Sequence, residues 1–258
     1  MTGAKKPAWL WLAGAAVVIA AVVVCQVVHS GVGFRAVKAA VALLAAASAG
    51  RVALGLGAGD HLRRAWSLLA CDYGVLGLAQ LLAIARVPVA VSVAVTILVN
   101  GFGIAAMVYF ARAHGVAGLD LPGSRGRQRA IYVTTGLLAL LLVGVPFVDT
   151  LQNLQAGNLR VLIITVSSIG DLVTFTLIGP ILLTALALRG GLLVWPWAFL
   201  VASNVAWFLQ DAAALGSIVW PDLGEDSVLL WTNLWQVLAC FLAFAAASAQ
   251  RRVSSQRE

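Results

Sequence analysis

Eight long apolar stretches follow one another along this 258-residue chain and set the limits on its fold. A helix rises 1.5 Å per residue, so about 20 apolar residues cross the roughly 30 Å hydrocarbon core of a bilayer. The strands of a membrane barrel would be shorter and would alternate polar with apolar residues, which these stretches do not. The sequence therefore predicts an all-α integral membrane protein with eight transmembrane helices. The expected spans are 8–28, 34–57, 65–85, 88–111, 129–148, 160–188, 192–215 and 227–249.

The composition supports lipid as the solvent for most of the surface. Only 10% of the residues are charged, 62% are hydrophobic, and the mean hydropathy is +0.98. Soluble domains carry about 25% charged residues because a water-facing surface has to be solvated. The net charge of +7 comes from short basic clusters between apolar stretches. Such clusters are typical of topology signals that contact lipid headgroups, so we expect a lipid bilayer and no nucleic acid as partner.

The basic residues also predict an orientation. If the N-terminus lies in the cytoplasm, thirteen of the seventeen Lys and Arg residues fall on the cytoplasmic side, and the acidic residues Asp222, Glu225 and Asp226 fall outside. This asymmetry follows the positive-inside rule. With eight crossings the C-terminus returns to the cytoplasm. Short termini without an organellar presequence favour the inner (plasma) membrane of a bacterium.

The longest connection between apolar stretches divides the chain into two comparable parts. We expect an N-terminal four-helix half (1–112), a basic cytoplasmic loop (113–128), a C-terminal four-helix half (129–250) and a short cytoplasmic tail (251–258). The halves show a weak repeat, which the following pairs define: Trp66 with Trp197, Tyr73 with Asn204, Gln80 with Asp211 and, after a small insertion, Asn100 with Asn233. Four helices per half is an even number, so the repeats would be parallel.

Asp171 is the polar residue whose insertion into the membrane is expected to cost the most free energy, because it lies near the middle of the sixth stretch. An ionisable side chain at that depth costs about 2.5–3.5 kcal/mol on insertion scales. Ser167 and Thr174 share its helix face, and Pro180 predicts a kink further along. One interpretation is a proton or cation site. The other is an interhelical hydrogen bond to an asparagine, but such bonds average only about 0.6 kcal/mol, which favours the functional interpretation.

Two polar stripes with a spacing of seven residues run along the third and seventh stretches. They contain Trp66, Tyr73 and Gln80 on one helix, and Trp197, Asn204 and Asp211 on the other, with Trp207 on the same face. Such a spacing is typical of a packing seam, yet seams between membrane helices favour small residues. The stripes could therefore line a central cavity, although Gln80 and Asp211 are expected near the outer ends, where water reaches. The candidate ion- or solute-binding residues are Asp171, Asp72, Asn100, Asn204, Asn233, Tyr73 and Trp207.

Other residues are expected to have structural roles. Six tryptophans close to span ends are typical of an interfacial aromatic belt. They are Trp9, Trp11, Trp66, Trp195, Trp197 and Trp220. The three histidines lie at span ends, the three cysteines form no metal-binding spacing, and the late spans contain no lysine for a retinal. Hydrolase and phosphate-binding motifs are also missing, so we expect neither enzyme activity, nor a metal, nor a cofactor.

Two functions are compatible with these features. The first is a small-solute or ion transporter with a mid-membrane acidic site, which the central Asp171 and the polar faces favour. The alternative is a non-enzymatic sensor, assembly factor or scaffold subunit that acts through a partner protein at the basic loop Arg112–Arg129. A water-accessible cavity that reaches Asp171 would favour transport. A packed interior with Asp171 bonded to Asn or Thr would favour the scaffold.

Overall fold

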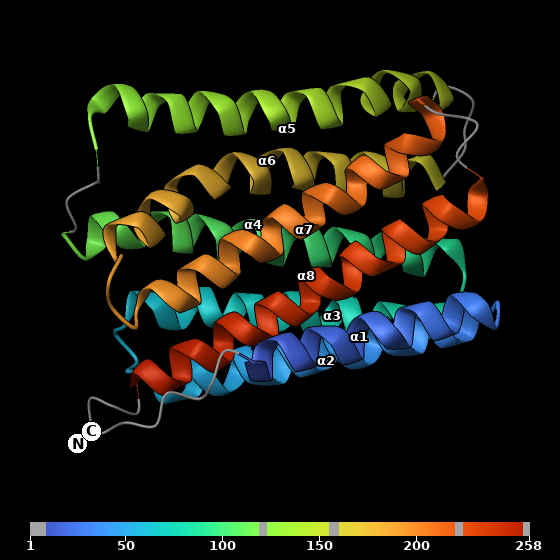
Figure 1. The fold of residues 1–258 in the computed structure, drawn as a ribbon. Helices are drawn as coiled ribbons and strands as arrows, with labels where there is room; N and C mark the ends of the chain where they lie inside the picture. The colour runs from blue at the N-terminus through green and yellow to red at the C-terminus, as the bar shows by residue number, and fades with distance from the viewer. Residues whose placement is uncertain (1–8, 119–122, 155–159, 220–223, 255–258) are drawn as a thin grey trace.

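The computed structural model describes residues 9–118, 123–154, 160–219 and 224–254, and all regular structure in these ranges is helical (Figure 1). Most helix ends lie within a few residues of the ends of the predicted spans. The eight helices are α1 (Trp9–Val27), α2 (Gly31–Gly55), α3 (His61–Ile84), α4 (Val89–Val116), α5 (Arg125–Leu154), α6 (Arg160–Ala187), α7 (Val194–Val219) and α8 (Glu225–Ser254).

Six of the helices are long and apolar enough to cross a membrane, namely α1, α2, α3, α4, α6 and α8. The remaining two, α5 and α7, have 30 and 26 residues, but their described residues contain no stretch of that apolarity. The predicted class, a helical membrane protein, is therefore confirmed. Helix α4 extends to Val116 and α5 begins at Arg125, so both helices reach into the stretch 113–128 that the sequence suggested as a loop.

Local side-chain caps explain where two of the helices begin. The Ser30 hydroxyl accepts a hydrogen bond from the backbone N–H of Gly33 at 2.9 Å, at the start of α2. The Asp60 carboxylate accepts one from the N–H of Leu62 at 2.8 Å, at the start of α3. Each cap satisfies a backbone donor that has no partner within the first turn of the helix.

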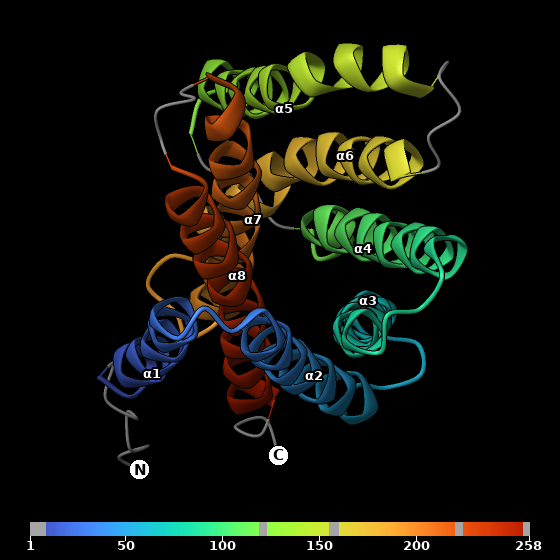
Figure 2. The same ribbon diagram turned by 90° about the vertical axis from the view of Figure 1, so that its right-hand side faces the viewer.

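The helices form a curved row that two oblique helices cross. Figures 1 and 2 show α3, α4, α6 and α5 following one another, with α7 and α8 running across one side of the row. Helix α2 packs against both α3 and α8, and α4 packs against α6. The guanidinium of Arg252 lies 5.0 Å from the ring centroid of Trp11, so the end of α8 meets the beginning of α1. The first and last described helices therefore reach the same side of the bundle.

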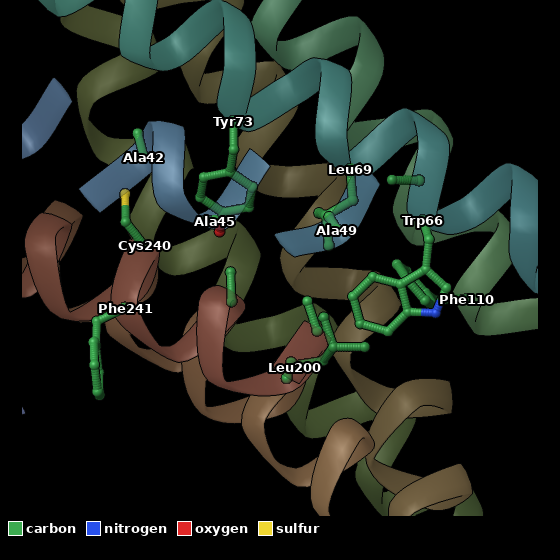
Figure 3. Close-up of a cluster of buried hydrophobic side chains, with 14 of the residues drawn as sticks. Ala42, Ala45, Ala49, Trp66, Leu69, Tyr73, Phe110, Leu200, Cys240 and Phe241 are labelled. Atoms are coloured by element: carbon green, nitrogen blue, oxygen red, sulfur yellow. The ribbon is translucent and has the colours of Figure 1, made fainter. Parts of the chain in front are cut away.

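Small residues allow α2, α3 and α8 to approach closely. Ala42, Ala45 and Ala49 are buried on α2 among residues of α3 and α8 (Figure 3). On α3, a Cβ at Gly77 would come within 2.7 Å of Leu43 Cγ. Because lipid is as apolar as a leucine side chain, helices in a membrane associate through such close packing rather than through the hydrophobic effect.

An aromatic cluster joins α3, α4 and α7. Phe110 is fully buried, and the rings of Trp66 and Trp197 meet it edge-on at centroid distances of 5.1 and 5.9 Å. This edge-to-face geometry suits the charge distribution of aromatic rings. Trp66 and Trp197 are 1% and 6% exposed, so their assignment to an interfacial belt is wrong. The side chain of Trp9 and all of Trp220 lie outside the described residues.

Candidate functional site

A cavity of about 300 Å³ lies between α3, α4, α6 and α7, with one residue of α8 in its wall. The helices that line it surround the middle of the bundle in Figure 2. Its described lining contains no Lys, Arg or His. The lining is otherwise rich in polar groups for a membrane protein. They include three carboxyls (Asp72, Asp171, Asp211) and five amides (Gln80, Asn100, Asn204, Gln210, Gln236).

Two of the carboxyls lie at the same depth on neighbouring helices. Asp171 is sixteen residues before the C-terminal end of α6, and Asp211 is seventeen residues after the N-terminal end of α7. Because a short turn joins these two ends, both side chains lie about 25 Å along their helices from that turn. Asn100 lies sixteen residues before the C-terminal end of α4, which brings it to the same level.

The carboxyl groups of Asp171 and Asp211 face each other within hydrogen-bonding reach. Asp171 is also bonded to the Ser167 hydroxyl one turn earlier, and Gln210 Nε2 donates to Asp211 Oδ1 at 3.1 Å. A hydrogen bond between two carboxyls needs a proton on one of them, since two carboxylates can only accept and repel each other. Two carboxyls in this arrangement can hold one proton between them.

A glycine allows α4 to approach α6 directly beside this pair. A Cβ at Gly170 would overlap Asn100 Oδ1, so only glycine leaves room for the amide. Asn100 Nδ2 donates to the backbone carbonyl of Thr96 at 2.9 Å, which holds the side chain in this position. The alternative expected from the sequence, an interhelical bond between Asp171 and an asparagine, is not found within the described part of the chain.

Tyr73 and Trp207 belong to a hydrogen-bonded chain that links α3, α7 and α8. Ser203 Oγ donates to the carbonyl of Ala239 at 2.8 Å, so it can only accept from the Tyr73 hydroxyl, 3.2 Å away. Trp207 Nε1 in turn donates to the Tyr73 hydroxyl at 3.3 Å. Both side chains line the cavity, but their polar hydrogens are used within the protein. Their direct contribution to a ligand is a ring surface.

Three other polar side chains in the cavity wall have no hydrogen-bond partner among the described residues. They are Asp72, Gln80 and Gln236. The carboxyl of Asp72 lies opposite Gly103, where an added Cβ would be 3.4 Å from Asp72 Oδ2. All three side chains are partly exposed, so their polar groups are open to water or to a polar ligand in the cavity.

Six of the seven predicted binding residues line the cavity: Asp171, Asp72, Asn100, Asn204, Tyr73 and Trp207. Asn233 does not, because it is buried on α8 and donates to the carbonyl of Leu229 at 2.8 Å. Helix α6 continues through Pro180, whose carbonyl accepts from Thr184 Oγ1 at 2.9 Å, and the kink stays a prediction.

The binding residues predicted from the sequence did not include Asp211 and Gln80. Both were expected near the outer ends of their spans, yet both face the same cavity as Asp171. The available signal was the repeat, because its alignment pairs Gln80 with Asp211 on two polar stripes. Weighing that pairing above distance from the span ends would have included both residues.

The described residues contain no group of three or more His, Cys, Asp or Glu side chains that could hold a metal ion. Comparison of the chain with protein-family models, with curated proteins and with solved structures finds no match.

Proposed function

We propose that this protein is a membrane transporter for a small polar solute or ion, with the cavity as its binding site. The observation that carries the proposal is the cavity itself, which reaches Asp171 and contains a second carboxyl that faces the first. Keeping an ionisable group at mid-membrane costs about 2.5–3.5 kcal/mol, and functional sites are where proteins retain such groups. A sensor or scaffold subunit with a partner at Arg112–Arg129 predicts a packed interior, so the cavity favours transport over it.

The proposed architecture has eight spans in two parallel four-helix halves, residues 1–112 and 129–250. One pair of contacts corresponds between the halves, since α4 packs against α6 as α8 packs against α2. Two of the aligned residue pairs also have similar surroundings. Trp66 and Trp197 both pack on Phe110, and Asn100 and Asn233 each donate to a carbonyl four residues earlier.

Such a repeat suggests how transport would proceed. In transporters built from related halves, the substrate site lies near the midplane, and rocking of the halves exposes it to each side in turn. The cavity wall draws on both halves here, with α3 and α4 from the first and α6, α7 and α8 from the second. The basic residues favour an orientation with both termini in the cytoplasm, and the proposed location is the inner membrane.

The test is flux through vesicles that contain the purified protein. We expect wild-type protein to accelerate the movement of protons, or of one probe from the set of sodium, n-butylammonium and glycerol, above that of empty vesicles. Asp171→Asn removes the central ionisable group and should lower this flux at least about 10-fold. Asp60→Asn is the matched control, because asparagine preserves the helix cap outside the cavity and flux should stay unchanged. Wild-type flux equal to that of empty vesicles for every probe, or equal flux in Asp171→Asn and wild type, would refute the proposal.

A further inference from the structure

The cavity has features that point to a particular class of ligand and to the way in which the ligand is exchanged. We propose that the Asp171–Asp211 pair binds the ammonium group of a small organic cation in exchange for the proton that the two carboxyls share. This inference rests on the proposed transport function and deepens it. It would make the protein an exchanger of protons against organic cations.

The charge balance of the site favours such an exchange. With its shared proton, the pair carries one negative charge, and Ser167 and Gln210 donate hydrogen bonds to it. When the proton leaves to cavity water, both carboxylates become negative and the arriving cation restores the net charge to minus one. The proton-bound and the cation-bound site therefore have the same net charge. Exchange avoids burying an additional unpaired charge, which would be costly where solvation is poor. Without the cation, loss of the proton would leave two adjacent negative charges that repel each other.

The lining favours an organic ammonium ion over a metal ion. No group of three potential metal-ligating acidic, His or Cys side chains exists among the described residues, and the cavity is far larger than a bare ion. An ammonium group has N–H donors that match carboxylate and amide acceptors. The apolar part of such a ligand would lie against the ring of Trp207 and the side chains of Leu76, Val95 and Val99. Anions are disfavoured, because the described lining offers carboxyls and no basic residue.

Polar groups without a protein partner face the cavity beside the carboxyl pair. Asp72, Gln80 and Gln236 line the same cavity, and none of them is hydrogen-bonded to a described residue. The carboxyl of Asp72 is open to the cavity and would gain a partner when a cation with several donors enters. A ligand that bridges the carboxyl pair and these groups would satisfy acceptors on both halves of the protein.

Few other titratable groups surround the pair. Helix α3 contributes the Asp72 carboxyl and the Tyr73 phenol, and α8 contributes the Cys240 thiol behind Tyr73. Helix α4 presents Asn100 at this depth, and the described side chains of α5 add no titratable group there. The described lining contains no Lys or Arg, so the shared proton is the charge that an entering cation replaces.

The experiment measures binding and proton release on the same purified protein in detergent. Binding of n-butylammonium is followed by calorimetry, and the protons released into a weakly buffered solution are followed with a pH-sensitive dye. We expect roughly one proton released per cation bound, and no binding of the neutral analogue 1-butanol at the same concentration. Sodium should neither compete with n-butylammonium nor release protons.

Two variants separate the exchange from simple binding. Asp211→Asn and Asp171→Asn each leave a single carboxylate with an amide donor beside it, so in either variant the cation should still bind while proton release is lost. The double variant Asp171→Asn/Asp211→Asn removes both carboxyls and should weaken binding about 30-fold or more. Asp60→Asn should match wild type in both measurements.

The outcomes distinguish the inference from the function on which it rests. If n-butylammonium binds to wild-type protein without releasing protons, or if sodium replaces it equally well, the exchange is refuted while a cavity that transports a solute stands. If n-butylammonium does not bind but another probe crosses the vesicle membrane, the ligand class is wrong. If no probe binds or crosses, the proposed function fails as well.

Discussion

Replacing Gly170 by alanine tests the geometry on which the site depends. The added Cβ would overlap Asn100 Oδ1 and lie 2.7 Å from Asn100 Cγ and 3.1 Å from its Cβ. The asparagine must then move, or α4 and α6 must separate. Overpacking of this kind costs about 1–3 kcal/mol, and losing the Asn100–Thr96 hydrogen bond adds about 0.6 kcal/mol. The better helix propensity of alanine returns up to about 1 kcal/mol, so we expect a net loss of about 1–2 kcal/mol.

The assay is thermal unfolding of the purified protein in detergent, followed by the loss of its monodisperse peak in size-exclusion chromatography. A loss of 1–2 kcal/mol corresponds to a midpoint roughly 2–8 °C lower for a chain of this size. Gly101→Ala is the matched control. Gly101 follows Asn100 on α4, and a Cβ added there would have no atom of another residue within 4 Å. That variant should be as stable as wild type or slightly more stable.

A second substitution shows whether the collision is the cause. Asn100→Ala removes the two atoms closest to the new Cβ, so the double variant should recover most of the stability that Gly170→Ala loses. The coupling between the two positions should be about 1 kcal/mol or more. Equal stability of Gly170→Ala and Gly101→Ala, or a double variant no more stable than Gly170→Ala, would show that α4 and α6 are not packed as described.

Two further predictions address the hydrogen-bonded chain and the number of spans. Tyr73→Phe leaves the N–H of Trp207 without its acceptor and should lower the free energy of unfolding by about 1–2 kcal/mol in the same assay. Tyr109→Phe is the control and should be neutral, because the Tyr109 hydroxyl bonds to no described residue. Equal stabilities of the two variants would contradict the hydrogen bonds that join Trp207, Tyr73 and Ser203. Single cysteines at Ser124, Leu192 and Gly224, in a background without the three native cysteines, test whether α5 and α7 cross the membrane. With eight spans, an impermeant thiol reagent should reach Ser124 and Leu192 from one side and Gly224 from the other. Labelling of Ser124 and Leu192 from opposite sides would show that α5 does not cross, and labelling of Leu192 and Gly224 from the same side would show that α7 does not cross.

The amino-acid sequence was sufficient to predict the helices. The stretch predicted at 160–188 is α6, Arg160–Ala187, and the one predicted at 34–57 is α2, Gly31–Gly55. Bilayer thickness sets the length of an apolar helix, and this constraint acts on each segment separately. The cost of a mid-membrane carboxyl is also local, which is why Asp171 was identified without knowledge of its neighbours.

Only the tertiary structure determined which helix faces meet. It placed Asp211 beside Asp171, moved Asn233 away from the cavity, and buried Trp66 against Phe110 instead of at the membrane surface. In a soluble protein, the apolar face of a helix marks the interior. Here the lipid is as apolar as the protein core, so apolar residues cover all faces and do not indicate which one is inside. The rotation of each helix depends on small residues such as Gly170 and on its packing partners, and these contacts join positions far apart in the chain.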